Sequence, residues 1–114
     1  SLVVIDPRAT ALARQADLHL PVRPGTDLVL ALGIARRLFE RGAVDEVFLA
    51  AHATGVEAFR ERVEPWTLDR VAAITGLPAE AIDAFVERYA TTRPSVIRCG
   101  WGLERNRNGT EAVM

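Results

Sequence analysis

Short apolar runs alternate with longer amphipathic stretches along this chain. Residues 2–5 form a continuous and largely β-branched apolar run, which is typical of a strand buried on both faces. Similar runs at residues 18–22 and 95–98 predict a second and a third strand. Because strands that alternate with helices form parallel sheets with helical crossovers, the pattern predicts an α/β fold.

Helical periodicity and helix-capping residues predict the elements between these strands. Residues 28–41 are apolar nearly all round over the first two turns, which indicates a helix covered by other elements. Residues 78–89 begin with a proline suited to a first helical turn and carry a single apolar stripe. Shorter helices are predicted at residues 10–16, 46–51, 56–63 and 68–74, with Asp45, Thr54 and Thr67 as N-caps, Thr26 or Asp27 capping the helix at 28–41, and Gly42 and Gly76 as helix ends.

Length and composition limit the classes of protein to consider. A chain of 114 residues is long enough for one modest core, so we expect a single domain over residues 1–114. Its 14 basic and 15 acidic side chains give a net charge of −1, without the basic excess of a nucleic-acid-binding surface, and no nucleic-acid partner is expected. The longest apolar run, residues 28–35, is far shorter than the ~20 residues that span a bilayer, so no membrane segment is expected. The single cysteine, Cys99, excludes an internal disulfide framework and fits a cytoplasmic protein.

The two ends of the sequence predict a piece of a longer protein. A strand pattern begins within the first residues, and the last residues follow a glycine-containing turn at which a helix could begin. We therefore expect further chain on both sides of this segment.

Polar loops follow each of the three predicted strands, at residues 6–8, 24–27 and 100–108. The carboxyl ends of parallel strands meet at one edge of a sheet, and ligands bind beyond that edge. We therefore expect the three loops to converge on one binding site.

The first two loops carry groups suited to a nucleotide. Asp6 could accept two hydrogen bonds from a ribose diol or from the N1–H and N2–H edge of guanine, and the planar fork of Arg8 could bind a phosphate. Residues 24–27 precede a helix, whose free N–H groups and positive dipole end favour an anion or an acceptor-rich ligand. The alternatives are a plain turn in which Asp6 caps the next helix, and a plain capping loop.

The third loop places an aromatic side chain between two glycines. Gly100 and Gly102 permit a close backbone approach to a ligand, and Trp101 could cover a flat ring. The alternative is a solvated surface loop.

The remaining chemistry-bearing residues do not form a catalytic pattern. His19 and His52 have no carboxylate or cysteine at metal-ligand spacing and are expected to be structural or surface groups. Cys99 at a strand end is expected to be a small buried hydrophobe. No catalytic group and no metal ligand are therefore expected in this chain.

These motifs together resemble a known family. Residues 3–8 read Val-Val-Ile-Asp-Pro-Arg, and residues 20–27 read Leu-Pro-Val-Arg-Pro-Gly-Thr-Asp. The similarity continues at Thr10, Ala16-Asp17, residues 48–50, Gly55, residues 57–60, Trp66-Thr67, residues 75–78, Tyr89-Ala90 and residues 100–103. Over almost its whole length the chain resembles the molybdopterin oxidoreductases of the dimethyl sulfoxide reductase superfamily, which include formate dehydrogenases and nitrate reductases.

The resemblance implies a fold and a cofactor. The fold is a Rossmann-like, three-layer αβα domain with a mostly parallel sheet, part of a larger multidomain enzyme. The cofactor is a bis(molybdopterin guanine dinucleotide) that carries molybdenum or tungsten. By motif position, the residues that line the guanosine of one pterin are Asp6, Pro7, Arg8, Thr10, Gly25, Thr26 and Asp27.

The loop of Gly100, Trp101, Gly102 and Arg105 resembles a family segment that approaches the pterin. The family usually has a methionine at the position of Trp101 and a glutamine at the position of Arg105. The side chains at these two positions therefore depart from the family pattern.

The resemblance places the redox chemistry outside this segment. The metal ligand of the family, and the cysteines of the [4Fe–4S] cluster found in many members, lie upstream of it. The rest of the parent chain and the pterin cofactor are the expected partners, an electron-transfer partner belongs to the parent, and a periplasmic parent is also compatible. The segment alone is expected to bind rather than catalyse.

Two alternatives stay open at this point. One is a non-catalytic α/β module that binds a nucleotide, or a partner protein through Trp101 and its polar loop. The other is a separate Rossmann-like domain for NAD or a similar nucleotide.

Overall fold

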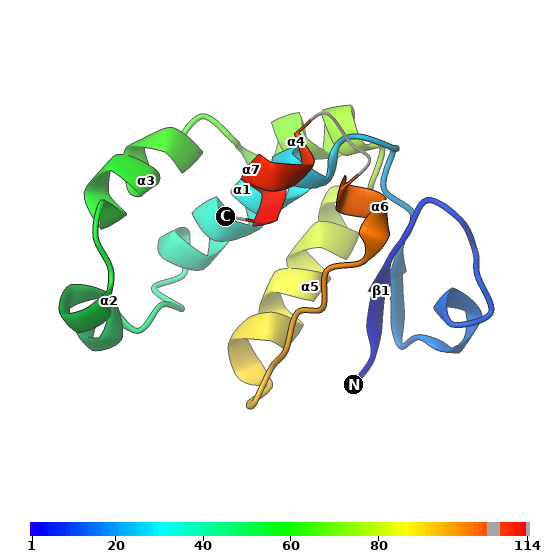
Figure 1. Ribbon diagram of the computed structural model, residues 1–114, viewed down its shortest axis with the longest axis horizontal. Coiled ribbons are helices and arrows are strands. Elements are labelled where there is room, and N and C mark those ends of the chain that lie inside the picture. Colours follow the sequence, from blue (N-terminus) through cyan, green and yellow to red (C-terminus); the bar gives the residue numbers. More distant parts are fainter. Residues whose placement is uncertain (105–107, 114) are drawn as a thin grey trace.

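The computed structural model describes residues 1–104 and 108–113. This part of the chain is mostly helical and contains a small sheet of two parallel strands (Figure 1). The elements in chain order are β1 (Val3–Ile5), the 3₁₀-helix η1 (Ala13–Gln15), β2 (Leu18–Leu20), α1 (Asp27–Glu40), α2 (Glu46–His52), α3 (Val56–Val63), α4 (Leu68–Thr75), α5 (Ala79–Thr91), α6 (Trp101–Glu104) and α7 (Gly109–Val113).

The two strands lie side by side in parallel, with Val3 opposite Leu18 and Ile5 opposite Leu20. The connection between them contains η1, and its end is tied to the start of β1 because Asp17 N–H donates to the carbonyl of Leu2 at 2.9 Å. The first two predicted strands and their parallel sense are therefore confirmed. Both carboxyl ends lie at the same edge of the sheet.

The third predicted strand is wrong. Residues 95–98 have no regular structure; Val96 is 90% exposed and Ile97 64% exposed, and the segment runs from α5 toward α6 (Figure 1). A strand needs a neighbour for its N–H and C=O groups, and within the described residues β1 and β2 pair only with each other. Consequently these residues do not build the expected three-layer αβα arrangement.

Most predicted helices are confirmed, with small shifts of their ends. Asp45 caps α2 by accepting from Phe48 N–H at 2.9 Å, and Thr67 is the expected N-cap of α4. The N-cap of α3 is Gly55 rather than Thr54, in a left-handed conformation with φ 74° that favours glycine. The helix predicted at residues 10–16 is reduced to η1.

The core lies where β2 meets α1, α4 and α5, and Val71 on α4 and Ile82 on α5 are completely buried in it. Gly33 on α1 allows the close approach of α1 to α4, because a Cβ atom at this position would lie 2.5 Å from Cγ2 of Val71. The buried members of this cluster are Leu20, Val22, Leu30, Val71, Leu77, Ile82 and Phe85.

Ion pairs join the solvent-facing sides of α1 and α5. The Asp83 carboxylate accepts from Arg37 Nε at 2.8 Å and from Arg41 Nη2 at 2.6 Å, and Arg41 also pairs with Glu87. The hydrogen bond from Arg37 is the main reason that the pKa of Asp83 lies below its ordinary value, and the positive charge of Arg41 adds to the shift. Asp83 is therefore a stabilising contact between the two helices.

The substitution Gly33→Ala should destabilise the chain by about 1–3 kcal/mol through overpacking, although alanine normally favours a helix interior by roughly 0.5–1 kcal/mol over glycine. Val71→Ala removes the two atoms closest to the new methyl group, Cγ2 at 2.5 Å and Cγ1 at 3.0 Å, and leaves Cβ at 3.2 Å. In that background Gly33→Ala should be neutral or stabilising. Urea denaturation of the four variants of this cycle measures the coupling, and purely additive effects would contradict the close helix contact.

The substitution Asp83→Asn should cost about 1 kcal/mol at neutral pH, because partly exposed ion pairs contribute modestly. The pKa of Asp83 is lowered in the folded chain from the ordinary value of 3.8. Its stabilisation is therefore complete well above that value and lost as the pH falls through the lowered pKa. In denaturant unfolding experiments from pH 7 toward pH 2, the difference in free energy of unfolding between wild type and Asp83→Asn should decrease. Asp69→Asn is the control, since Asp69 forms no ion pair with any described residue; an advantage that persists at low pH would contradict the assignment.

Candidate functional site

The backbone of Asp6 is fixed at the carboxyl end of β1 by two contacts with β2. Its N–H donates to the carbonyl of Leu20 at 3.3 Å. Its carbonyl lies 2.8 Å from Nε2 of His19 and accepts a hydrogen bond from that nitrogen. Hydrogen bonds to both the N–H and the carbonyl of Asp6 therefore fix the direction in which the chain leaves β1.

The Asp6 side chain closes a short turn. Its Oδ1 accepts from the backbone N–H of Arg8 at 2.7 Å, which is an Asx-turn across Pro7. Thr10, and not Asp6, accepts from the first N–H of η1, since its Oγ1 lies 3.1 Å from the nitrogen of Ala13. The turn interpretation is thus correct for Oδ1, but the capping role belongs to Thr10.

Two polar groups of this loop remain available to a ligand. Among the described residues, Oδ2 of Asp6 has no hydrogen-bond partner, and the exposed Arg8 guanidinium forms neither a hydrogen bond nor an ion pair. Asp6 itself is half-buried. The loop therefore presents an open carboxylate oxygen next to an unpaired positive charge.

The second loop is a tight turn before α1. The carbonyl of Arg23 accepts from Thr26 N–H at 3.2 Å, and Gly25 has a φ of 80°. Proline followed by a glycine with positive φ is the signature of a type II turn. The Thr26 hydroxyl donates to the same Arg23 carbonyl at 2.7 Å, so it makes no capping bond to α1.

Arg23 attaches this turn to the C-terminus of α4. Its N–H donates to the carbonyl of Thr75 at 2.8 Å, and its Nη1 donates to the carbonyl of Ile74 at 2.7 Å. The last carbonyls of a helix lack intrahelical partners and lie at the negative end of its dipole, so a guanidinium is well suited to them. No local sequence pattern indicates a role for Arg23, because its side-chain partner Ile74 lies 51 residues away.

The first two loops therefore leave the same end of the parallel strand pair (Figure 1). Asp27, half-buried, is the first residue of α1 directly after the second turn. The structure thus brings the Asp6–Arg8 loop and the Gly25–Asp27 turn to one edge of the sheet, as expected.

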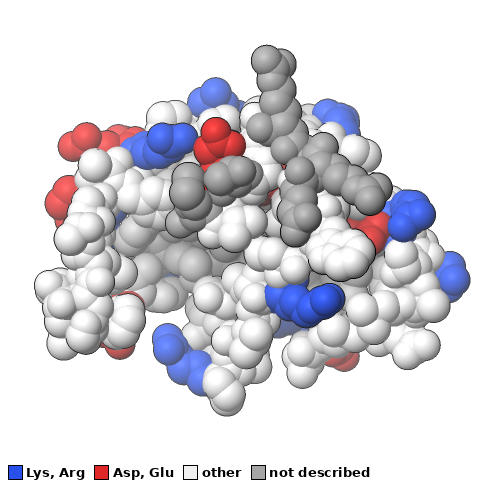
Figure 2. Space-filling view, in the orientation of Figure 1, with Lys and Arg blue, Asp and Glu red and all other residues white. Residues whose placement is uncertain are grey.

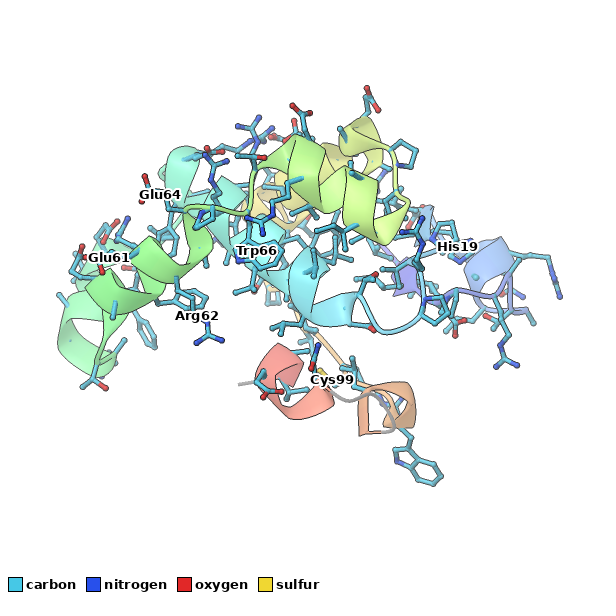
Figure 3. All side chains as sticks on the ribbon, turned by 90° about the horizontal axis from the view of Figure 1, so that it is seen from above. His19, Glu61, Arg62, Glu64, Trp66 and Cys99 are labelled. Atoms are coloured by element: carbon cyan, nitrogen blue, oxygen red, sulfur yellow. The ribbon has the colours of Figure 1, made fainter. Side chains whose placement is uncertain are left out.

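The third loop does not reach this edge through a strand. Gly100 precedes α6 and Gly102 lies within it, a Cβ atom at either would meet nothing within 4 Å, and Trp101 is 79% exposed. Helix α6 packs on α7, and α7 packs on α1, off the layer of the other helices (Figure 3). Cys99 is exposed beside these helices, so its expected burial is wrong. Arg105 lies outside the described residues.

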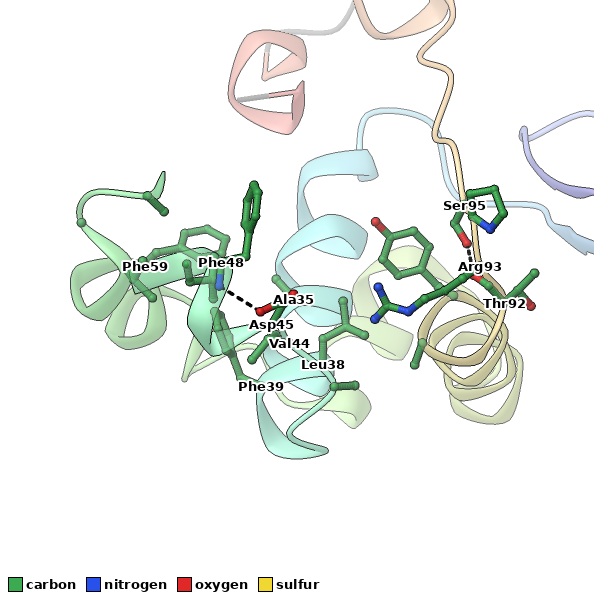
Figure 4. Close-up of a pocket in the computed structure, with 18 of the residues that line it drawn as sticks. Ala35, Leu38, Phe39, Val44, Asp45, Phe48, Phe59, Thr92, Arg93 and Ser95 are labelled. Carbon is green, nitrogen blue, oxygen red and sulfur yellow. Dashed lines mark hydrogen bonds between the residues drawn. The ribbon is translucent and has the colours of Figure 1, made fainter. Parts of the chain in front are cut away.

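A groove of about 800 Å³ lies elsewhere, between α1, α2, α3 and the end of α5 (Figure 4). Figure 2 shows the surface receding between the α2–α3 pair and α5. Apolar side chains including Leu38, Phe39, Phe48 and Phe59 line it, and the carboxylate of Asp45 at its rim is occupied by the helix cap. None of the predicted site residues that the structure describes contributes to this groove.

The described residues contain no group of three or more histidine, cysteine, aspartate or glutamate side chains that could hold a metal ion. No helix within them is long and apolar enough to cross a membrane.

Comparison with known proteins places this arrangement in a family. The profile of the family described as "Molybdopterin oxidoreductase" matches residues 1–114. The probable oxidoreductase YoaE of Bacillus subtilis is 41% identical over 95% of this chain, and formate dehydrogenase H of Escherichia coli is 31% identical over 98%. The solved structure of acetylene hydratase from Pelobacter acetylenicus superposes with a TM-score of 0.93 over 97% of this chain at 35% identity.

The matches cover nearly all of this chain but only 16% of each of these two relatives and 15% of the solved acetylene hydratase chain. The residues here therefore correspond to one part of much larger proteins. The resemblance of the strand-end motifs is confirmed, and the chain belongs to the molybdopterin oxidoreductase family.

Proposed function

We propose that this chain holds the guanosine end of a bis(molybdopterin guanine dinucleotide) within a longer molybdopterin-dependent oxidoreductase. The observation that carries the proposal is the pairing of two polar loops at one edge of the parallel strands, with Oδ2 of Asp6 open. That edge is where parallel sheets bind nucleotides. Membership of the molybdopterin oxidoreductase family supports a molybdopterin guanine dinucleotide as the ligand.

The groups at this edge match the chemistry of a guanosine phosphate. A carboxylate accepts hydrogen bonds from the N1–H and N2–H of guanine or from a ribose diol, and Asp6 and Asp27 are the two carboxylates of these loops. The Arg8 guanidinium is unpaired in the described part of the chain and suits a phosphate. Pro7, Thr10, Gly25 and Thr26 shape the two turns that present these groups.

This chain would orient the cofactor and leave the redox chemistry to other parts. When bound, the cofactor supplies a molybdenum or tungsten centre that changes oxidation state during the reaction. The metal ligand, any [4Fe–4S] cluster and the contact with an electron-transfer partner belong to the remaining chain of the parent. The residues here bind one tail of the cofactor and contribute no proton transfer or nucleophile.

We further propose that the sheet grows in the longer protein. Within the described residues β1 has a neighbour on one side only, and the β-branched residues of the 95–98 segment are exposed. Strands from the remaining chain would pair with both, complete a Rossmann-like αβα domain, and carry Gly100, Trp101, Gly102 and Arg105 toward the pterin. Such pairing explains why residues 95–98 have the sequence pattern of a strand but no strand structure in the 114-residue chain.

Hydrogen exchange tests the growth of the sheet. The amides of residues 96–98 should exchange rapidly in the 114-residue chain, since they have no ladder partner there. In the longer protein they should become protected, because a paired strand must open before its amides exchange. The β2 amides, already paired, are the internal reference. Equally fast exchange of 96–98 in both proteins would contradict the proposed pairing.

Loss of the loop carboxylates tests the binding role. Asp6→Ala and Asp27→Ala in the longer protein, produced in a host that makes the cofactor, should each lower the bound dinucleotide, measured as GMP released by acid hydrolysis per mole of protein. Removing one charged hydrogen-bonding group costs roughly 1.5–3 kcal/mol, which corresponds to about ten- to hundredfold in affinity. Asp69→Ala on the exposed face of α4 is the matched control. Unchanged GMP content and unchanged cofactor release in both loop variants would refute the proposal.

A further inference from the structure

His19 lies in the middle of β2, directly opposite Val4 of β1. It is half-buried, and its ring reaches past the end of β1 to place Nε2 2.8 Å from the carbonyl oxygen of Asp6. Figure 3 shows His19 beside the strand pair. The sequence alone predicts a structural or surface role for this residue. It is the polar residue of an otherwise apolar three-residue strand.

The contact determines the backbone direction at Asp6. A carbonyl oxygen can only accept, so Nε2 of His19 carries the hydrogen and donates it. Because the next residue is Pro7, the plane of the Asp6 carbonyl also sets the path of the chain into the turn. That plane and the restricted φ of Pro7 together limit where the Arg8 N–H lies, and this N–H donates to Oδ1 of Asp6 at 2.7 Å.

The same chain of contacts sets the position of the open carboxylate oxygen. With Oδ1 held by Arg8, the direction of Oδ2 depends on the backbone of the turn. The bond from Asp6 N–H to Leu20 is longer, at 3.3 Å, so it constrains the turn less than the His19 contact does. The orientation of the Asp6 carboxylate therefore depends on a side chain of the neighbouring strand.

We propose that His19 is a positioning residue for the guanosine site, acting through the Asp6 carbonyl on the direction of the Asp6 carboxylate and of the Arg8 side chain. The inference rests on the proposed function, because it concerns how the guanosine-binding carboxylate is aimed. His19 itself does not contact the ligand in this proposal. It contributes a hydrogen-bond donor, Nε2–H, to the Asp6 carbonyl.

The test compares variants that keep or remove that donor in the longer, cofactor-loaded protein. His19→Gln retains an N–H donor on a side chain of similar reach, whereas His19→Leu fills similar volume without one. The measured quantity is the rate at which bound dinucleotide is lost on incubation, followed as protein-bound GMP, because affinity differences within one complex appear mostly in the dissociation rate. His52→Leu on exposed α2 is the control histidine. The melting temperature of every variant is recorded alongside.

The loss of one neutral hydrogen bond predicts a release rate about two- to tenfold faster in His19→Leu. His19→Gln and His52→Leu should release the cofactor at the wild-type rate, and Asp6→Ala should release it faster than any of them. If Asp6→Ala is faster and His19→Leu is not, the positioning role fails and the proposed function stands. If His19→Gln and His19→Leu release the cofactor equally fast and are equally destabilised, His19 acts only through its packing and the positioning role fails. If Asp6→Ala releases the cofactor at the wild-type rate, the inference fails, and if Asp27→Ala does so as well, the proposed function fails with it.

Discussion

The carbonyl of Leu20 accepts a hydrogen bond from Asp6 N–H and another from Val22 N–H, while the side chain of the same residue is completely buried. One residue therefore ties the end of β1, the exit of β2 and the hydrophobic core together. Because the strands are parallel, this junction puts both polar loops at one edge of the sheet. Antiparallel pairing would have sent the loops to opposite ends, and no common site would exist.

The second loop depends on the helical core rather than on the strands alone. Arg23 binds the last carbonyls of α4, so the turn at Gly25 follows the position of that helix. The position of α4 against α1 is set in turn by Val71 packed on Gly33. A change deep between these helices would therefore move a loop at the surface, because closely packed interiors transmit strain.

The local features of the fold could be predicted from the sequence. Strand patterns before Asp6 and in 18–22, the helix ends and the caps Asp45 and Thr67 each depend on residues close in the chain, and the structure contains them. The failure of the third strand has its cause in distant partners. The 95–98 segment has strand propensity but no described neighbour, and propensity alone does not supply a ladder partner.

The two anchoring side chains of the site illustrate the same limit. His19 donates to a carbonyl 13 residues away, and Arg23 donates to a carbonyl 51 residues away. No local sequence motif therefore predicts either contact. The signal for His19 was its polarity within a buried apolar strand, since buried polar groups are nearly always hydrogen-bonded. Its ring had to have a partner, but only the fold could identify that partner as Asp6.

Under the proposed function, the edge described here is one side of a binding site, and a single exposed side can hold a charged ligand only weakly. Charged contacts in open water contribute little, because water competes for the same groups and salt screens them. Oδ2 of Asp6 and the exposed Arg8 guanidinium gain strength only where water is excluded and the local dielectric falls. This chain spans about 15% of the solved relative, so in the proposed longer protein other residues would form the opposite sides of the site. Under the proposed function, tight retention of a dinucleotide is therefore a property of the assembled protein, and these loops determine where the guanosine end lies.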